Sequence, residues 1–79
     1  MSQEDKRYAA AEEVWGEYDC GDVTVVESNQ FETDGPDRLI CKFYYAPDEA
    51  DPYIDSESAS FCVNFVAGRD KVADAYINW

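Results

Sequence analysis

Carboxylates are the only abundant side chains in this sequence that could do chemistry. The chain carries 18 Asp and Glu residues against 6 Lys and Arg, for a formal net charge of -12, and it contains no histidine. The commonest general base, the Ser-His and Cys-His nucleophile pairs and the commonest metal ligand are therefore missing. Carboxylate pairs could act as acid and base, but at this acid content neighbouring pairs arise by chance. We expect no enzyme and no catalytic residue.

The cysteines and glycines add no reactive motif. Cys20, Cys41 and Cys62 form an odd set without a CxxC pair, which argues against a disulfide framework and against a zinc knuckle. We expect buried thiols in a reducing compartment, and a Cys41–Cys62 bridge stays open if their strands are neighbours. The 4 glycines are scattered, so no phosphate-binding loop is predicted and no cofactor is expected.

The acidic stretch around residues 48–57 is a candidate for binding a hard cation. An EF-hand register that starts at Asp51 puts Tyr53 at the third position, Ser56 where glycine is required and Cys62 where the bidentate glutamate belongs. The EF-hand pattern therefore fails, and we assign no metal ligands. An irregular divalent-cation module remains an alternative, which calorimetry with calcium or magnesium would detect.

The excess negative charge lies in the middle of the chain. Residues 8–37 contain nine acids and no base, residues 43–68 contain five more acids, and the two ends are balanced. Packing a core does not require this charge, and its self-repulsion destabilises the fold. A field of this sign repels nucleic acid and anionic membranes and attracts cations or basic protein surfaces. We expect a basic protein partner, with no direct nucleic-acid or membrane binding.

The spacing of the acids could imitate a nucleic-acid backbone. Carboxylates four residues apart on a helix lie about 6 Å apart along its axis, and those two apart on a strand about 6.6 Å, comparable to neighbouring phosphates along one strand. Three pairs have such spacing: Glu13 with Glu17, Glu32 with Asp34, and Asp55 with Glu57. The target of such a surface would be a Lys/Arg groove built for phosphates.

In size, acidity and lack of histidine the chain resembles small phage-encoded inhibitors that mimic DNA, of the anti-CRISPR type. The resemblance covers the whole chain as a type and includes no motif. It implies a compact α+β inhibitor that works in the host cytoplasm by occupying the DNA-binding groove of a CRISPR effector complex. The partner-binding residues would be Glu12, Glu13, Glu17, Asp19 and Asp22 in one group, and Asp48, Glu49, Asp51, Asp55 and Glu57 in a second, with Tyr53 as an aromatic anchor.

A different class of function fits the same composition. Acidic residues keep halophilic proteins hydrated, so the chain could be a small structural or interaction domain from a high-salt organism. Its melting temperature would then rise steeply with molar salt. The sequence leaves the oligomeric state open.

The first half of the chain predicts a helix followed by two strands. Ser2 can cap a helix whose apolar face contains Tyr8, Ala11 and Trp15, with Gly16 as an early end. A strand is predicted from residue 23 towards residue 33. The turn at residues 34–37 then leads back into a second strand over 38–45.

The second half predicts a loop, a third strand and a short helix. Residues 46–57 have the composition of a loop, and 58–67 alternate as a strand. Asp70 can cap a helix with Val72, Ala73, Tyr76 and Ile77 on one face, although 75–79 could be an edge strand. Trp15 and Trp79 are assigned to the core.

We therefore predict a single α+β domain over residues 1–79, with an α-β-β-β-α order and a three-stranded antiparallel sheet. No stretch approaches the roughly 20 apolar residues of a membrane span, and residues 1–8 lack the pattern of a signal peptide. We expect a cytoplasmic protein.

Overall fold

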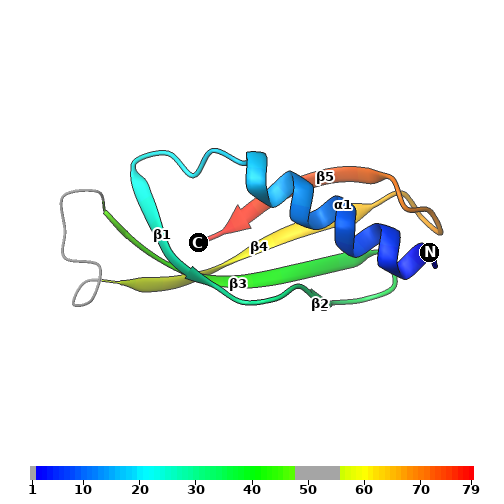
Figure 1. Cartoon of the computed structure of the whole chain (residues 1–79), viewed down its shortest axis with the longest axis horizontal. Coiled ribbons are helices and arrows are strands. Elements are labelled where there is room, and N and C mark those ends of the chain that lie inside the picture. Colours follow the sequence, from blue (N-terminus) through cyan, green and yellow to red (C-terminus); the bar gives the residue numbers. More distant parts are fainter. Residues whose placement is uncertain (1, 48–55) are drawn as a thin grey trace.

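The protein has one helix and one antiparallel sheet, described by a computed structural model for residues 2–47 and 56–79 (Figure 1). In chain order the elements are α1 (Gln3–Glu17), β1 (Val23–Ser28), β2 (Glu32–Thr33), β3 (Arg38–Pro47), β4 (Glu57–Phe65) and β5 (Val72–Asn78). The strand order is β1-β3-β4-β5, and β2 also pairs with β3. The predicted three-stranded sheet with two helices is therefore wrong: the sheet has five strands and the described residues form a single helix.

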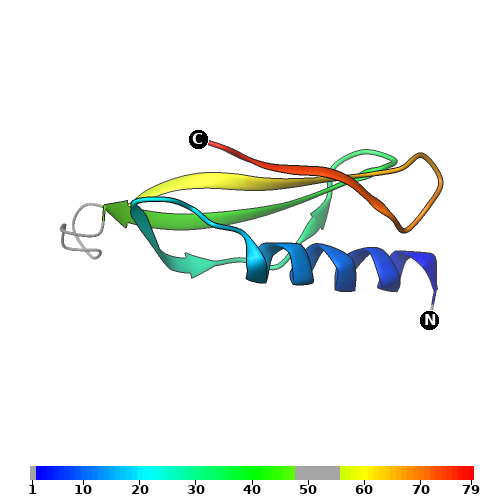
Figure 2. The same ribbon diagram turned by 90° about the horizontal axis from the view of Figure 1, so that it is seen from above.

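Helix α1 begins where the sequence predicts it, directly after the capping residue Ser2. The Ser2 side chain accepts a hydrogen bond from the Asp5 N–H at 3.2 Å, which satisfies one of the free donors of the first turn. The helix continues through Gly16 to Glu17, so Gly16 does not end it early. It lies against one face of the sheet, as the view from above shows (Figure 2).

The predicted first strand is two short strands. β1 and β2 both pair with β3, and a bulge shifts the register between Val25 and Glu27. Phe31 lies between β1 and β2, and its side chain is buried in the core, where it is 7% exposed. The predicted turn at residues 34–37 is present: Gly35 has a φ of 106°, and the Asp34 N–H donates to the Arg38 carbonyl at 2.9 Å.

The predicted C-terminal helix is instead the edge strand β5. Val72, Ala73, Tyr76 and Ile77 have helical spacing, but the segment pairs with β4 from Val72 to Asn78. β4 lies mostly inside the sheet, and its backbone groups on the side away from β3 need partners, which only a neighbouring strand supplies along its whole length. Pairing with β4 therefore overrides the local pattern, and Asp70 caps no helix.

The core lies between α1 and the sheet. Its buried side chains are Ala11, Phe31, Leu39, Cys41, Phe43, Ala59, Phe61, Val63 and Phe65. Trp15 packs on this cluster as predicted, with ring centroids 4.6 Å from Phe61 and 4.9 Å from Phe43. Trp79 does not belong to it: it is 60% exposed and meets Tyr45 edge-on.

The face of the sheet away from α1, here called the open face, carries the alternate residues of the strands. Ile40, Cys62 and Tyr76 lie side by side across it. Cys41 faces the core, so Cys41 and Cys62 point to opposite faces of neighbouring strands and both thiols are free. The bridge left open by the sequence does not form.

Candidate acidic binding surface

Helix α1 presents three carboxylates away from the sheet. Glu12, Glu13 and Glu17 are exposed, whereas Ala11 on the opposite side of the helix is fully buried. Glu13 and Glu17 are one turn apart, about 6 Å along the axis. The helix itself is held by the ring contacts of Trp15, so these carboxylates stand on a fixed support.

The connection from α1 to β1 extends the same acidic surface. Asp19 and Asp22 are exposed, and the Asp19 carboxylate accepts the Gly21 N–H at 2.8 Å. Gly21 has a φ of 78°, a conformation that glycine adopts without strain. The turn therefore fixes the direction of Asp19. We call the set Glu12, Glu13, Glu17, Asp19 and Asp22 the acidic ridge.

The ridge carries no ion pair among the described residues. The ion pairs of residues 2–47 and 56–79 are Arg7–Asp37 at 2.9 Å and Arg38–Asp34 at 3.5 Å, and neither involves the ridge. Lys42 lies over the ring of Tyr44, 5.7 Å from its centroid. The two central cations that could have neutralised the acids are thus engaged elsewhere.

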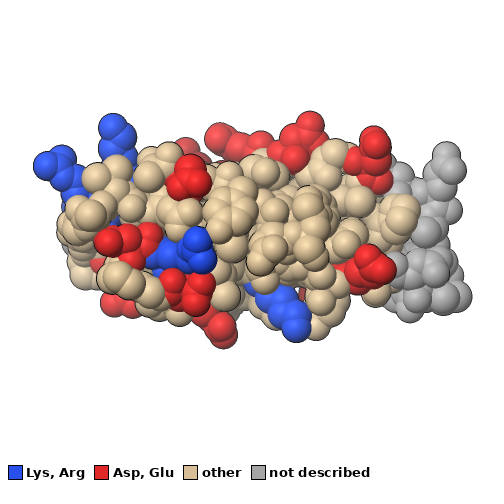
Figure 3. All heavy atoms as spheres, turned by 180° about the vertical axis from the view of Figure 1, so that it is seen from behind, with Lys and Arg blue, Asp and Glu red and all other residues tan. Residues whose placement is uncertain are grey.

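Positive charge gathers near the opposite end of α1. Arg7 in the first half of the helix donates to the carbonyl of Arg69 in the turn between β4 and β5, which also holds Lys71. Figure 3 shows the open face, with Lys and Arg reaching out at the upper left, Asp and Glu around much of the rim, Lys or Arg also left of centre and on the lower rim, and a mostly uncharged middle. The bases at this end lie beside Glu4, Asp5 and Asp70, so charge of both signs is present there, whereas the acidic ridge contains no base.

The second predicted group lies mostly outside the described residues. This applies to Asp48, Glu49, Asp51, Tyr53 and Asp55. Glu57 opens β4 opposite Tyr45, whose hydroxyl donates a hydrogen bond to the Glu57 carboxylate at 3.0 Å. This hydrogen bond is the main reason why the pKa of Tyr45 is raised. The first group is therefore exposed on α1 and the connection after it, whereas most of the second group lies outside the described residues.

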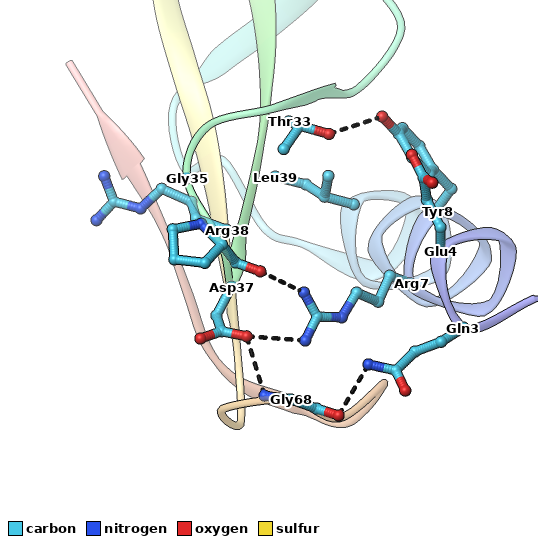
Figure 4. A pocket seen from close by; sticks show the side chains of 11 residues that line it. Gln3, Glu4, Arg7, Tyr8, Thr33, Gly35, Asp37, Arg38, Leu39 and Gly68 are labelled. Carbon is cyan, nitrogen blue, oxygen red and sulfur yellow. Dashed lines mark hydrogen bonds and ion pairs between the residues drawn. The ribbon is translucent and has the colours of Figure 1, made fainter.

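A hollow of about 620 Å³ lies between the start of α1 and the turn before β3 (Figure 4). Arg7 closes its floor: the guanidinium donates to the Pro36 carbonyl at 2.8 Å and to the Asp37 carboxylate at 2.9 Å. It also lies over the Phe65 ring, 5.0 Å from the centroid. Arg7 thus joins three segments through all three of its guanidinium nitrogens, which indicates a structural role.

Arg7 is not among the residues that the sequence predicts to be important. A usable signal exists, because Arg7 precedes Ala11 by four residues and so shares the buried face of α1. A basic residue on that face has to find acceptors inside the fold. The acceptor carbonyls lie in turns that are 29 and 62 residues away along the chain. No local sequence pattern predicts that these turns meet Arg7.

Asp37 gives this junction a pH dependence. Its pKa is lowered, first by the hydrogen bond from the Gly68 N–H at 3.0 Å and then by that from Arg7. A lowered folded-state pKa stabilises the fold above the ordinary Asp value, and this contribution is lost as the pH falls through the folded value.

We therefore expect Asp37→Asn to melt at a lower temperature than the wild type, by an amount that is constant around neutral pH. The difference should shrink as the pH falls below about 4, the ordinary Asp value, towards the lower folded value at which the native carboxyl becomes protonated. Thermal melting of both proteins across this range measures it, and comparing the two removes the shared effect of the other acids. A difference independent of pH would contradict this role of Asp37.

Cys20 and Cys41 show no sign of activation. Burial raises the pKa of Cys41, and burial together with the Asp19 carboxylate raises that of Cys20. No group of three Cys, Asp or Glu residues within 2–47 and 56–79 is arranged to hold a metal ion. The helical structure of these residues is not long and apolar enough to cross a membrane.

Comparison of the chain with protein-family models, curated proteins and solved structures finds no match. The acidic ridge is therefore judged on its geometry and charge alone.

Proposed function

We propose that the protein is a non-enzymatic inhibitor whose acidic ridge binds the basic nucleic-acid-binding groove of a host defence complex. A CRISPR effector complex, as targeted by anti-CRISPR proteins, is the partner class that fits this role. The carboxylates take the places of target-strand phosphates and so block DNA binding. The observation that carries the proposal is the ridge itself: five exposed carboxylates on the last turns of α1 and the connection that follows, without an ion pair among the described residues.

The support beneath the ridge favours binding. Trp15 on the inner side of α1 contacts Phe43 and Phe61, and both phenylalanines are fully buried. A surface that is already ordered loses less conformational entropy when it binds. Opposite charge on the partner also speeds the encounter. A cytoplasmic location goes with this proposal.

The ridge can be tested by charge reversal. The double variant Glu13→Lys/Glu17→Lys is expected to weaken binding to its effector complex about a hundredfold, since each lysine replaces an attraction by a like-charge contact. Binding is measured by biolayer interferometry on a panel of purified, guide-loaded effector complexes. Competition with labelled target DNA shows whether the groove is the site.

A matched control makes the same change of net charge elsewhere. Asp5→Lys/Asp70→Lys places one lysine in the first turn of α1 and the other in the turn between β4 and β5. Both positions are exposed and lie outside the ridge. This variant should bind within a few-fold of the wild type. Equal losses in the two folded variants would show that only total charge matters and would refute the ridge as the binding site.

A further inference from the structure

Strand β5 leaves one edge of the sheet open. The Phe65 N–H donates to the Asp37 carbonyl on the β3 side, so the alternation of an antiparallel ladder turns the backbones of Asn64 and Cys62 towards β5. Their partners Asp74 and Tyr76 therefore face β4. The N–H and C=O groups of Ala75 and Ile77 then point away from the sheet, where no described segment pairs with them.

The opposite edge is protected. There a bulge interrupts β1, Phe31 leaves the edge between β1 and β2, and Glu27 and Glu32 add charge. Bulges, short strands and charges are the features that keep sheet edges from pairing. β5 has seven residues with one charged side chain, Asp74, and small alanines on both sides of it. The register of β5 against β4 also shifts, between the pairs Asn64–Asp74 and Phe65–Val72, so the regular part of this outer edge runs from Asp74 to Asn78.

The β5 edge is also the part of the molecule where a second copy meets the least repulsion. Arg69 and Lys71 in the preceding turn balance Asp70 and Asp74, so residues 69–79 carry no net side-chain charge in a chain of charge -12. The acidic ridge lies on α1 and the connection that follows, and α1 packs on the same face of the sheet as Ala75 and Ile77, so the low charge holds for the backbone edge of β5 itself.

We propose that two copies pair through β5, antiparallel about a two-fold axis at Ala75. This register puts Asp74 opposite Tyr76 of the second copy, on the same face of the sheet. In each copy the Tyr76 hydroxyl lies 2.8 Å from the Arg38 guanidinium, which donates to it. The Asp74 carboxylate thus lies opposite a tyrosine whose hydroxyl accepts a hydrogen bond from Arg38, so this arginine, which also pairs with Asp34, gains a second carboxylate nearby, and the contact occurs twice. The sheet runs continuously through the dimer, with both helices on one face.

Hydrogen exchange tests the pairing residue by residue. In a monomer the Ala75 and Ile77 amides are free, whereas the Tyr76 amide is bonded to β4. In the β5-paired dimer all three are protected. We expect the Ala75 and Ile77 amides to slow as the concentration of the full chain rises, in parallel with the dimer fraction from analytical ultracentrifugation. A monomer at every concentration overturns the proposal, as does a dimer whose Ala75 and Ile77 amides exchange freely.

Two variants with the same net charge separate the contact from general repulsion. Asp74→Lys places a lysine beside Tyr76 and Arg38 of the second copy, and should raise the dimer dissociation constant about tenfold or more. Asp70→Lys makes the same charge change outside β5, and should leave dimerisation unchanged or slightly stronger because repulsion falls. Circular dichroism checks that both fold. The inference fails if Asp74→Lys dimerises as well as Asp70→Lys does.

Salt distinguishes this dimer from the proposed inhibitor contact. Screening weakens attraction between an acidic ridge and a basic groove, but it strengthens association between two copies that repel each other. Dimerisation should therefore increase with salt while binding to an effector complex decreases. The dimer does not depend on the proposed inhibition, and either result can fail without the other.

Discussion

Replacing Arg7 with methionine is expected to lower the free energy of unfolding by about 3 kcal/mol, since hydrogen bonds from a charged group to several acceptors are lost together. The Arg7 side chain is 12% exposed, and its guanidinium donates to Pro36, Asp37 and Arg69 at 2.8–2.9 Å. Methionine keeps the helix propensity and the packing on Phe65 but supplies no donor. Urea denaturation measures the change against a total of roughly 4–12 kcal/mol for a chain of this size.

Two further variants define what is lost with Arg7. Lys6→Met removes the same charge from an exposed neighbour and should stay within about 0.5 kcal/mol of the wild type. Arg7→Lys keeps the charge but not the planar set of donors, so it should recover only part of the loss. If Arg7→Met were as stable as Lys6→Met, the junction of α1 with the two turns would not be a source of stability.

Features specified by neighbouring residues could be predicted from the sequence. Helix α1 begins at its Ser2 cap, and the apolar spacing of Tyr8, Ala11 and Trp15 identifies its buried face. The acidic ridge follows from this, because Glu12, Glu13 and Glu17 occupy the remaining face. In each case the decisive signal lies within one or two helical turns.

Features that depend on distant partners could not be predicted. The spacing of Val72, Tyr76 and Ile77 suits a helix, yet Phe61 and Cys62 on β4 select a strand by pairing with this segment. Trp79 was assigned to the core because large aromatic residues are usually buried, but it follows the last residue of β5 and meets Tyr45 at the surface. The acceptors of Arg7 are equally remote in sequence.

Phe61→Ala should destabilise the protein by about 4 kcal/mol, the cost of deleting a buried aromatic ring and leaving a cavity. Phe61 is fully buried, and its ring lies 4.6 Å from Trp15 and 4.9 Å from Tyr18 by centroid distance. Phe61→Leu fills more of the space and should cost about 1.5 kcal/mol. Chemical denaturation ranks the two variants. Similar stabilities would show that the core collapses around the missing ring.

The same substitution connects the core with the proposed function. α1 rests on Phe61 through Trp15 and Tyr18, whereas β3 and β4 are also held by their own ladder. In the fraction of Phe61→Ala that stays folded, amides of α1 should therefore exchange faster relative to those of β3 than in the wild type. Affinity for an effector complex should fall although every carboxylate of the ridge is intact, because the ridge must be ordered again on binding. Undiminished affinity in a variant with a loosened α1 would mean that the ridge does not need its support.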